Sequence, residues 1–337
     1  MSKAIRLSVL DLAPILVGGT ASDSLRNTRD LAQHAEAWGY HRYWLAEHHN
    51  MPGIASSATS LVISHVASAT NRIRVGSGGI MLPNHAPLII AEQFGTLESL
   101  YPGRIDLGLG RAPGSDQPAS RAIRRGAGND GQDFPDRLAE LRSYFHPAPG
   151  STPSVRAFPG EGLDVPIWLL GSSGFSAQLA GQLGLPFAFA SHFAPDYLLP
   201  ALQIYHANFQ PSTSLSEPYI MVGVGAVVAD TDEEARYLAT SQQQQFLNII
   251  RGRTGQLNPP VEDMEPLWSP QEKALLQGKS SHSLTGTPSK VQARLEEILQ
   301  ETQADEIIAT SQIFDHQARL KSYQLLSEAA APFVKVN

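Results

Sequence analysis

Short apolar runs alternate with longer amphipathic stretches from one end of the chain to the other. The apolar runs are continuous, which is typical of strands that are buried on both faces of a parallel sheet. They predict eight strands, at residues 5–10, 43–46, 73–82, 105–110, 166–170, 187–190, 219–228 and 306–310. The amphipathic stretches predict helices at residues 24–38, 57–69, 86–100, 135–145, 175–183, 195–209, 231–250, 288–300 and 315–330.

Local signals mark the beginnings and ends of these helices. In the first one, Leu31, Ala35 and Trp38 recur at helical spacing, and Gly39 then ends the helix. Residues 231–250 begin with Thr-Asp-Glu-Glu, in which the threonine is a good N-cap and the acidic residues suit a first turn. These signals support the alternation of strands and helices.

The alternation determines the predicted fold class. Eight strand–helix units without an early GxGxxG fingerprint favour an α/β TIM barrel, (β/α)8, over an open doubly wound sheet. Residues 112–131 and 251–283 lack a periodic pattern and are predicted to be loop insertions. We therefore expect residues 1–337 to form a single barrel domain, with its active site at the carboxyl ends of the strands.

Composition and charge narrow the function classes. The net charge of −7 argues against a nucleic-acid partner or an anionic membrane surface, because both need clustered Lys and Arg. The chain contains no cysteine, which excludes disulfides, thiolate nucleophiles and Cys-ligated zinc. It has no apolar stretch of the roughly 18 residues that span a bilayer, and no signal peptide is recognised at its start. The expectation is a soluble cytoplasmic protein.

Polar or small residues lie at or just after the carboxyl ends of six of the predicted strands. They are Glu47-His48-His49, Ser77-Gly78-Gly79, Gly110-Arg111, Gly171-Ser172-Ser173, Ser191-His192 and Ser311-Gln312. Because the carboxyl ends of barrel strands meet at one rim, these residues are the candidates for the site.

The cluster Glu47-His48-His49 leaves three interpretations open: a metal site, an acid/base group, or a hydrogen-bonded histidine pair in a loop. Adjacent side chains on an extended backbone point to opposite sides, so both histidines rarely bind one ion. No HExxH motif or second carboxylate-rich set completes a zinc site. Acid/base use of one histidine is favoured because imidazole titrates near neutral pH, and no metal is expected.

Residues 171–176 have the composition of an anion site. Ser172, Ser173 and Ser176 lie where a strand gives way to a helix, whose first N–H groups are free to bind phosphate. Simple N-capping by serine is the alternative. Arg111 could bind the same phosphate bidentately, or could form an ion pair with a nearby carboxylate.

Glycines inside two strands need an explanation. Gly78 and Gly79 interrupt an apolar strand, which indicates either a flat ligand lying against the backbone or a β-bulge. Gly223 and Gly225 form a lone GxG inside residues 219–228 and are better explained by close packing in the barrel interior.

Four motifs together resemble the bacterial luciferase-like flavin-dependent monooxygenases, and the similarity covers essentially the whole chain. They are Ala46-Glu47-His48-His49, RVGSGGIMLP at residues 74–83, PGR at 102–104 leading into GLGR at 108–111, and GSSGFSA at 171–177. The order and spacing of the set are specific. The sequence is most similar to the single-chain, uncharacterised branch of that family.

The resemblance implies a barrel that binds reduced FMN, used as a cosubstrate, at its carboxyl-end face. His48 matches the catalytic histidine of luciferases, and Glu47 matches an acid near the flavin ring. The pair Gly78–Gly79 matches the position of a non-prolyl cis peptide beneath the flavin. Gly110 replaces the reactive cysteine that luciferase has before its phosphate arginine.

The same resemblance implies the phosphate ligands. Arg111, Ser173 and Ser176 match phosphate-contacting residues of the family, and Arg137 is aligned with a second phosphate arginine. Ser172 stands where luciferase has a glutamate. All these residues are expected to bind the cofactor.

The function implied is a two-component monooxygenase. A separate flavin reductase supplies reduced FMN, and the enzyme uses oxygen to oxygenate a small organic substrate such as an aldehyde or a ketone. The resemblance also implies a homodimer. Two alternatives stay open: a deazaflavin-dependent oxidoreductase, which transfers hydride without consuming oxygen, and a non-catalytic flavin-binding protein.

Overall fold

A closed parallel barrel forms the centre of the molecule. The computed structural model describes residues 4–112, 114–124, 131–279 and 281–335. Within these residues the barrel strands are β1 (Arg6–Asp11), β2 (Arg42–Leu45), β3 (Arg74–Met81), β4 (Ile105–Gly110), β5 (Ile167–Gly171), β6 (Phe187–Phe189), β7 (Ile220–Val228) and β9 (Glu306–Thr310). Each pairs with the next, and β9 lies between β7 and β1, which closes the ring. The predicted α/β TIM barrel is confirmed.

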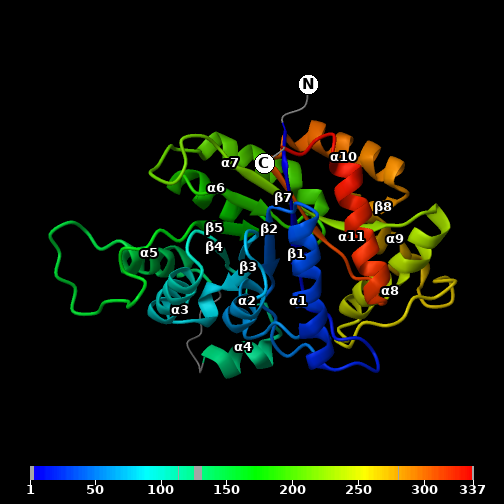
Figure 1. Ribbon diagram of the computed structural model, residues 1–337, viewed down its shortest axis with the longest axis horizontal. Coiled ribbons are helices and arrows are strands. Elements are labelled where there is room, and N and C mark those ends of the chain that lie inside the picture. Colours follow the sequence, from blue (N-terminus) through cyan, green and yellow to red (C-terminus); the bar gives the residue numbers. More distant parts are fainter. Residues whose placement is uncertain (1–3, 113, 125–130, 280, 336–337) are drawn as a thin grey trace.

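Helices surround the barrel (Figure 1). They are α1 (Ala21–Ala37), α2 (Thr59–Ala67), α3 (Pro87–Leu100), α4 (Gln117–Arg124), α5 (Phe134–Phe145), α6 (Gly174–Leu183), α7 (Leu198–Asn208), α8 (Asp232–Ile250), α9 (Pro270–Lys279), α10 (Pro288–Thr302) and α11 (His316–Ala330), with short 3-10 helices at Leu82–Asn84 and Pro195–Tyr197. Among these described helices, none is long and apolar enough to cross a membrane.

The two segments expected to be loop insertions contain regular structure. The expectation of an irregular stretch at 251–283 is wrong in part, because α9 lies inside it. Leu276 of α9 is buried against Leu247 and Met264, so a small local cluster stabilises this helix without a long periodic pattern. Residues 112–131 include α4, which has no buried residue, and part of that segment lies outside the described residues. A further short strand, β8 (Leu284–Gly286), pairs with the end of β7 and was not predicted.

Helix capping and the alternation of side chains along strands explain how the helices and strands form. The predicted cap of α8 is confirmed: the Thr231 hydroxyl accepts a hydrogen bond from the backbone N–H of Glu234. Along β7, Val222 and Val224 pack outward into the layer between barrel and helices. Met221 faces the barrel interior, as the period-two alternation of a strand requires.

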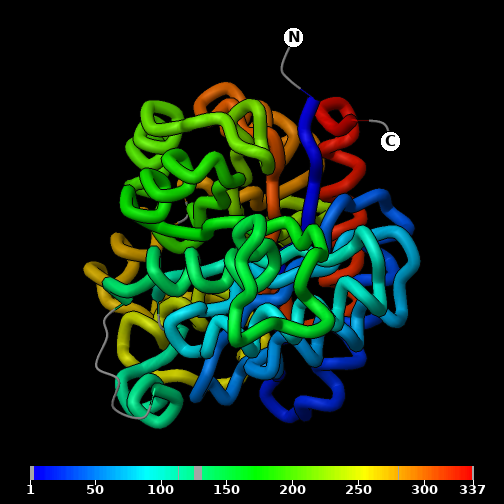
Figure 2. The backbone as a smooth tube through the Cα atoms, turned by 90° about the vertical axis from the view of Figure 1, so that its left-hand side faces the viewer, coloured from blue at the N-terminus to red at the C-terminus, as the bar shows by residue number. Residues whose placement is uncertain are grey.

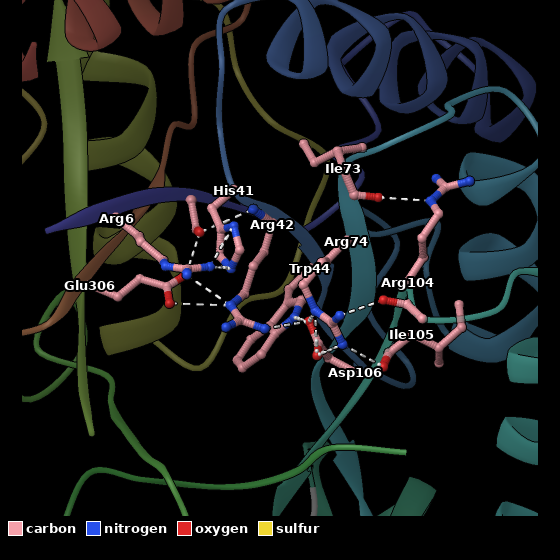
Figure 3. Close-up of polar contacts among 12 residues, drawn as sticks. Arg6, His41, Arg42, Trp44, Ile73, Arg74, Arg104, Ile105, Asp106 and Glu306 are labelled. Atoms are coloured by element: carbon pink, nitrogen blue, oxygen red, sulfur yellow. Dashed lines mark hydrogen bonds and ion pairs between the residues drawn. The ribbon is translucent and has the colours of Figure 1, made fainter. Parts of the chain in front are cut away.

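The N-terminal end of the barrel is filled by a buried network of charges (Figure 3). Arg42 donates to Asp106 at 2.7 Å and to Glu306 at 3.0 Å. Arg74 donates to the other oxygen of Asp106 at 2.6 Å, and the Trp44 indole N–H lies 3.2 Å from Asp106. Both carboxylates are fully buried. Because the arginines and the carboxylates form ion pairs with one another, buried side chains fill the N-terminal end of the barrel.

The described chain also starts and ends at this end of the barrel. Ile5 forms a parallel bridge with Val334, and the two terminal segments lie together in both views (Figures 1 and 2). The carboxyl ends of the strands therefore lie at the opposite end, next to α4 and α8 (Figure 1).

Candidate active site

A large cavity lies where the barrel strands end. Its volume is about 660 Å³, within the range of roughly 300–1,000 Å³ that is usual for ligand sites. Seven of the nine residues predicted to bind or act line it: His48, Gly78, Gly79, Arg111, Ser172, Ser173 and Ser176. Glu47 and Arg137 do not line it.

Glu47 is buried behind the cavity wall. Its carboxylate accepts hydrogen bonds from the ring nitrogens of His49 at 2.8 Å and His85 at 2.9 Å, and from the Met81 backbone N–H at 3.0 Å. Burial by itself would raise the pKa of Glu47, but these hydrogen bonds and the charge of His85 outweigh it and lower the pKa. The carboxylate is thus committed to the end of β3, and the expected contact of Glu47 with the cofactor stays a prediction.

His48 faces the cavity while its neighbour turns away. The Nδ1 atom of His48 lies 3.2 Å from the Gly114 carbonyl, whereas His49 binds Glu47. A carbonyl only accepts, so Nδ1 carries the proton and Nε2 remains for chemistry. Burial lowers the pKa of His48 from the ordinary histidine value, against the opposing effect of the Gly114 carbonyl. The side chain is therefore a neutral base near pH 7.

The different directions of the His48 and His49 side chains are relevant to the interpretation of this cluster as a metal site. Adjacent side chains on an extended backbone were expected to separate, and His48 and His49 contact different partners. Over the ranges that the structure describes, no group of three or more His, Asp or Glu side chains is arranged to hold a metal ion.

Arg111 and the start of α6 form one wall of the cavity. The Arg111 guanidinium lies 4.3 Å from the centre of the Phe175 ring, and no described carboxylate pairs with it. Ser173 is the N-cap of α6, yet its hydroxyl makes no capping hydrogen bond with a described residue. Ser176 is buried on the first turn of the helix. A cation that pairs with no described carboxylate, beside the N-terminus of a helix and its serine hydroxyls, suits a phosphate better than simple capping does.

The glycine pair in β3 combines both features considered from the sequence. The Gly78–Gly79 peptide bond is cis, as the resemblance implied. The pairing of β3 with β4 shifts register between Gly78 and Ile80, which is a bulge. Both glycines also line the cavity. A Cβ atom on Gly79 would lie 2.8 Å from the backbone carbonyl oxygen of Gly108, so the close approach of β4 favours glycine there.

Arg137 lies outside the cavity wall. Its side chain is bound to Asp133 one turn earlier in α5 and donates to the His85 carbonyl at 3.2 Å. The guanidinium is therefore already held by α5, and the expected contact of Arg137 with the phosphate stays a prediction. The resemblance aligned this residue across a loop of different length.

The site also contains residues that the sequence did not single out as ligands. His192, which follows β6, and Gln242 and Gln245 of α8 line the cavity. His192 could have been found, because it is polar and directly follows a barrel strand. The two glutamines carry no comparable signal, since they belong to a run of four on a helix.

Comparison with known proteins agrees with this geometry. The family model for luciferase-like monooxygenases matches residues 5–306. The chain is 60% identical over 322 residues to the uncharacterized protein YvbT of Bacillus subtilis, and 56% identical over 323 residues to a luciferase-like monooxygenase of Escherichia coli; each match covers 96% of both chains. The chain belongs to the luciferase-like monooxygenase family.

Members of the family with solved structures share the whole fold. The crystal structure of apo-MsnO8 has a TM-score of 0.87 and 33% identity, and covers 98% of this chain and 100% of that chain. An N-acetyl-S-alkylcysteine monooxygenase of Bacillus subtilis is 33% identical over 330 residues, covering 96% of this chain and 98% of its own. The luciferase-like assignment therefore extends across the barrel and its insertions.

More distant structures share the fold alone, and they differ in cofactor. The oxygenating constituent of 3,6-diketocamphane monooxygenase from Pseudomonas putida, a Baeyer-Villiger monooxygenase in complex with FMN, has a TM-score of 0.73 at 18% identity and covers 99% of this chain and 100% of that one. An F420-dependent secondary alcohol dehydrogenase has a TM-score of 0.67 at 13% identity and covers 97% and 99%.

Proposed function

We propose that this luciferase-like protein is a two-component monooxygenase that takes reduced FMN from a separate reductase and oxygenates a small organic substrate, such as an aldehyde or a ketone. The observation that carries the proposal is the wall formed by Arg111 and the start of α6. A guanidinium that pairs with no described carboxylate and a serine-lined helix N-terminus open into a largely apolar cavity of the barrel. That combination suits a ligand with one phosphate and a flat apolar ring.

The residues that would hold FMN form two groups, one for its phosphate and one for its ring. Arg111, Ser172, Ser173 and Ser176 would bind its phosphate, and the Gly78–Gly79 segment would support its ring. Reduced FMN supplies the activation of molecular oxygen, which protein side chains cannot provide. The protein contributes binding, orientation and exclusion of water.

His48 is the proposed proton-transfer residue. Its Nδ1–H is held by the Gly114 carbonyl, so Nε2 can accept a proton inside the cavity and return it. Glu47 does not touch the cavity and is given a positioning role. By holding His49, His85 and the Met81 N–H, it sets the shape of the β3 end beside His48.

The test is turnover with reduced FMN under labelled oxygen. Photoreduced FMN, the protein and a panel of aldehydes and ketones are mixed with ¹⁸O₂, and products are analysed by mass spectrometry. We expect incorporation of one labelled oxygen atom into a product. The His48→Ala variant should bind FMN normally but form less product and release more hydrogen peroxide; unchanged coupling of oxygen uptake to product would contradict the role of His48.

The same experiment separates the two alternatives. A deazaflavin-dependent oxidoreductase would convert an alcohol or carbonyl without oxygen uptake, and the fold shared with an F420-dependent dehydrogenase keeps this alternative open. A non-catalytic flavin-binding protein would bind FMN and form no product with any substrate. Oxygen uptake coupled to labelled product is incompatible with both.

We also propose a homodimer. Leu61 on α2 is 72% exposed, and Ile89 and Leu100 on α3 are 45% and 59% exposed. These large apolar side chains are exposed on two helices that contact each other, and a partner would cover them. Sedimentation velocity on the purified protein measures this directly.

A further inference from the structure

Two further side chains of the cavity wall carry polar atoms that form no hydrogen bond with a described residue. They are the Nδ1 atom of His192 and the Oε1 atom of Gln245, and both atoms are buried. Both side chains line the cavity. A buried polar atom left without a partner is costly, so such atoms in a cavity wall indicate a ligand that completes them.

The fold makes specific room for these side chains. A Cβ atom on Gly223 would lie 2.8 Å from Nδ1 of His192, and a Cβ atom on Gly225 would lie 3.2 Å from Nε2 of Gln242. The two glycines of β7 therefore admit a polar ring and an amide to the barrel interior. Close packing was expected at Gly223 and Gly225, and the groups that pack against them are the polar side chains of His192 and Gln242.

The position of His192 is fixed by its backbone. Its N–H donates to the Gly223 carbonyl at 2.9 Å, and the hydroxyl of the preceding Ser191 donates to the same carbonyl at 2.6 Å. The imidazole is thus anchored to β7 and held at the cavity, which favours a recognition role over that of a mobile side chain.

Charge is confined to another part of the cavity. Among the described residues that line it, Arg111 and Asp116 are the ones that carry a full charge at neutral pH, and both belong to the segment after β4. Burial lowers the pKa of His192 to about 4, so its ring is neutral. The same cavity is also lined by apolar side chains, among them Met221, Phe246 and Ile249.

We propose that His192, Gln242 and Gln245 form a substrate subsite that binds an uncharged amide or hydroxyl group, while the apolar wall binds the remainder of the molecule. A neutral imidazole and two primary amides offer donors and acceptors together, which matches a group that does both. With Arg111 assigned to the phosphate in the proposed function, no described wall residue with a positive charge is left for a substrate carboxylate. The inference rests on the proposed function, in which the reacting carbonyl is a separate group of the substrate.

Three probes of equal chain length test the charge preference: hexanamide, hexanoate and hexylammonium. Their dissociation constants are measured by calorimetry on the full chain, with and without saturating FMN. We expect hexanamide to bind most tightly. Absence of saturable hexanamide binding, or tighter binding of hexanoate, overturns the proposal.

Variants test the residues. His192→Ala and Gln245→Leu should each weaken hexanamide binding about 5–10-fold, the size expected for one lost hydrogen bond, with the FMN affinity unchanged. Gln243→Leu is the matched control, because Gln243 lies in the same run on α8 but does not line the cavity. Gln245→Leu keeps the test valid if His192→Ala does not fold. Equal hexanamide affinity in Gln245→Leu and Gln243→Leu overturns the assignment.

The results for FMN binding and for hexanamide binding distinguish a failure of this inference from a failure of the proposed function. If FMN does not bind but hexanamide still binds through Gln245, the flavin proposal fails and the subsite stands. If FMN binds and supports oxygenation but the variants do not affect hexanamide, the subsite fails and the proposed function stands.

Discussion

Replacing Arg111 with glutamine is the sharpest test of the phosphate site. The guanidinium pairs with no described carboxylate, so its removal leaves no buried acid without a partner. A charge-assisted hydrogen bond to phosphate contributes about 1.5–3 kcal/mol. The dissociation constant of FMN should therefore rise by about 10–150-fold. The loss of stacking on Phe175 concerns an exposed ring and should change the free energy of unfolding by less than about 1 kcal/mol.

Riboflavin is the control ligand because it has the same ring and no phosphate. Fluorescence quenching measures both flavins with the native protein and with Arg111→Gln. We expect the variant to lose its preference for FMN while its riboflavin affinity stays within about twofold, a change below ~0.5 kcal/mol. Equal weakening of both flavins would mean that Arg111 acts on the ring or on folding. An unchanged FMN affinity would refute the phosphate site itself.

Four further outcomes are expected. Asp106→Asn should lower the free energy of unfolding by about 3–5 kcal/mol, because it leaves buried arginines unpaired. The unfolding entropy is ~2.1 cal/mol/K per residue, so calorimetry should show a melting temperature about 4–7 °C lower. Arg42, Arg74 and their hydrogen bonds lower the pKa of Asp106 although burial would raise it. Its contribution to stability is therefore complete above pH ~5 and is lost progressively as the pH falls from the ordinary aspartate pKa of ~3.9 through the lower pKa of the folded state, which acid titration of unfolding would show. Product formation should keep its rate down to a pH below the usual histidine range of ~6.5, since His48 acts in its neutral form, and His48→Asn should abolish the acid limb of the pH–rate profile. Leu61→Asp should convert the dimer to a monomer in sedimentation velocity, whereas Leu275→Asp on exposed α9 should not.

The barrel and one wall of its site could be predicted from sequence because both depend on local patterns. Each barrel strand is a continuous apolar run, and the polar residues at the strand ends meet once the sheet closes. Arg111 and Ser173 are far apart in the chain, yet the same rule brings them to one wall. The order of the strands was sufficient for this step.

The remaining site residues depend on side-chain partners that no local pattern records. Glu47 turns away from the cavity because His85 and the Met81 N–H bind it. Arg137 is held by Asp133, and Gln245 reaches the cavity only because α8 packs over the strand ends. In each case a contact between distant segments decides the role, and the residue type alone permits several.

The Glu47-His48-His49 cluster divides structural and chemical tasks among three adjacent residues. A carboxylate inside the cavity would place a negative charge beside a site suited to phosphate and an electron-rich ring. With Glu47 turned behind β3, His49 and His85 hydrogen-bond its carboxylate away from the ligand. His48, on the opposite side of the extended chain, then faces a cavity in which burial keeps it neutral. The alternation of side chains along the strand end is thus what allows a buried acid and a cavity base to stand next to each other in the sequence.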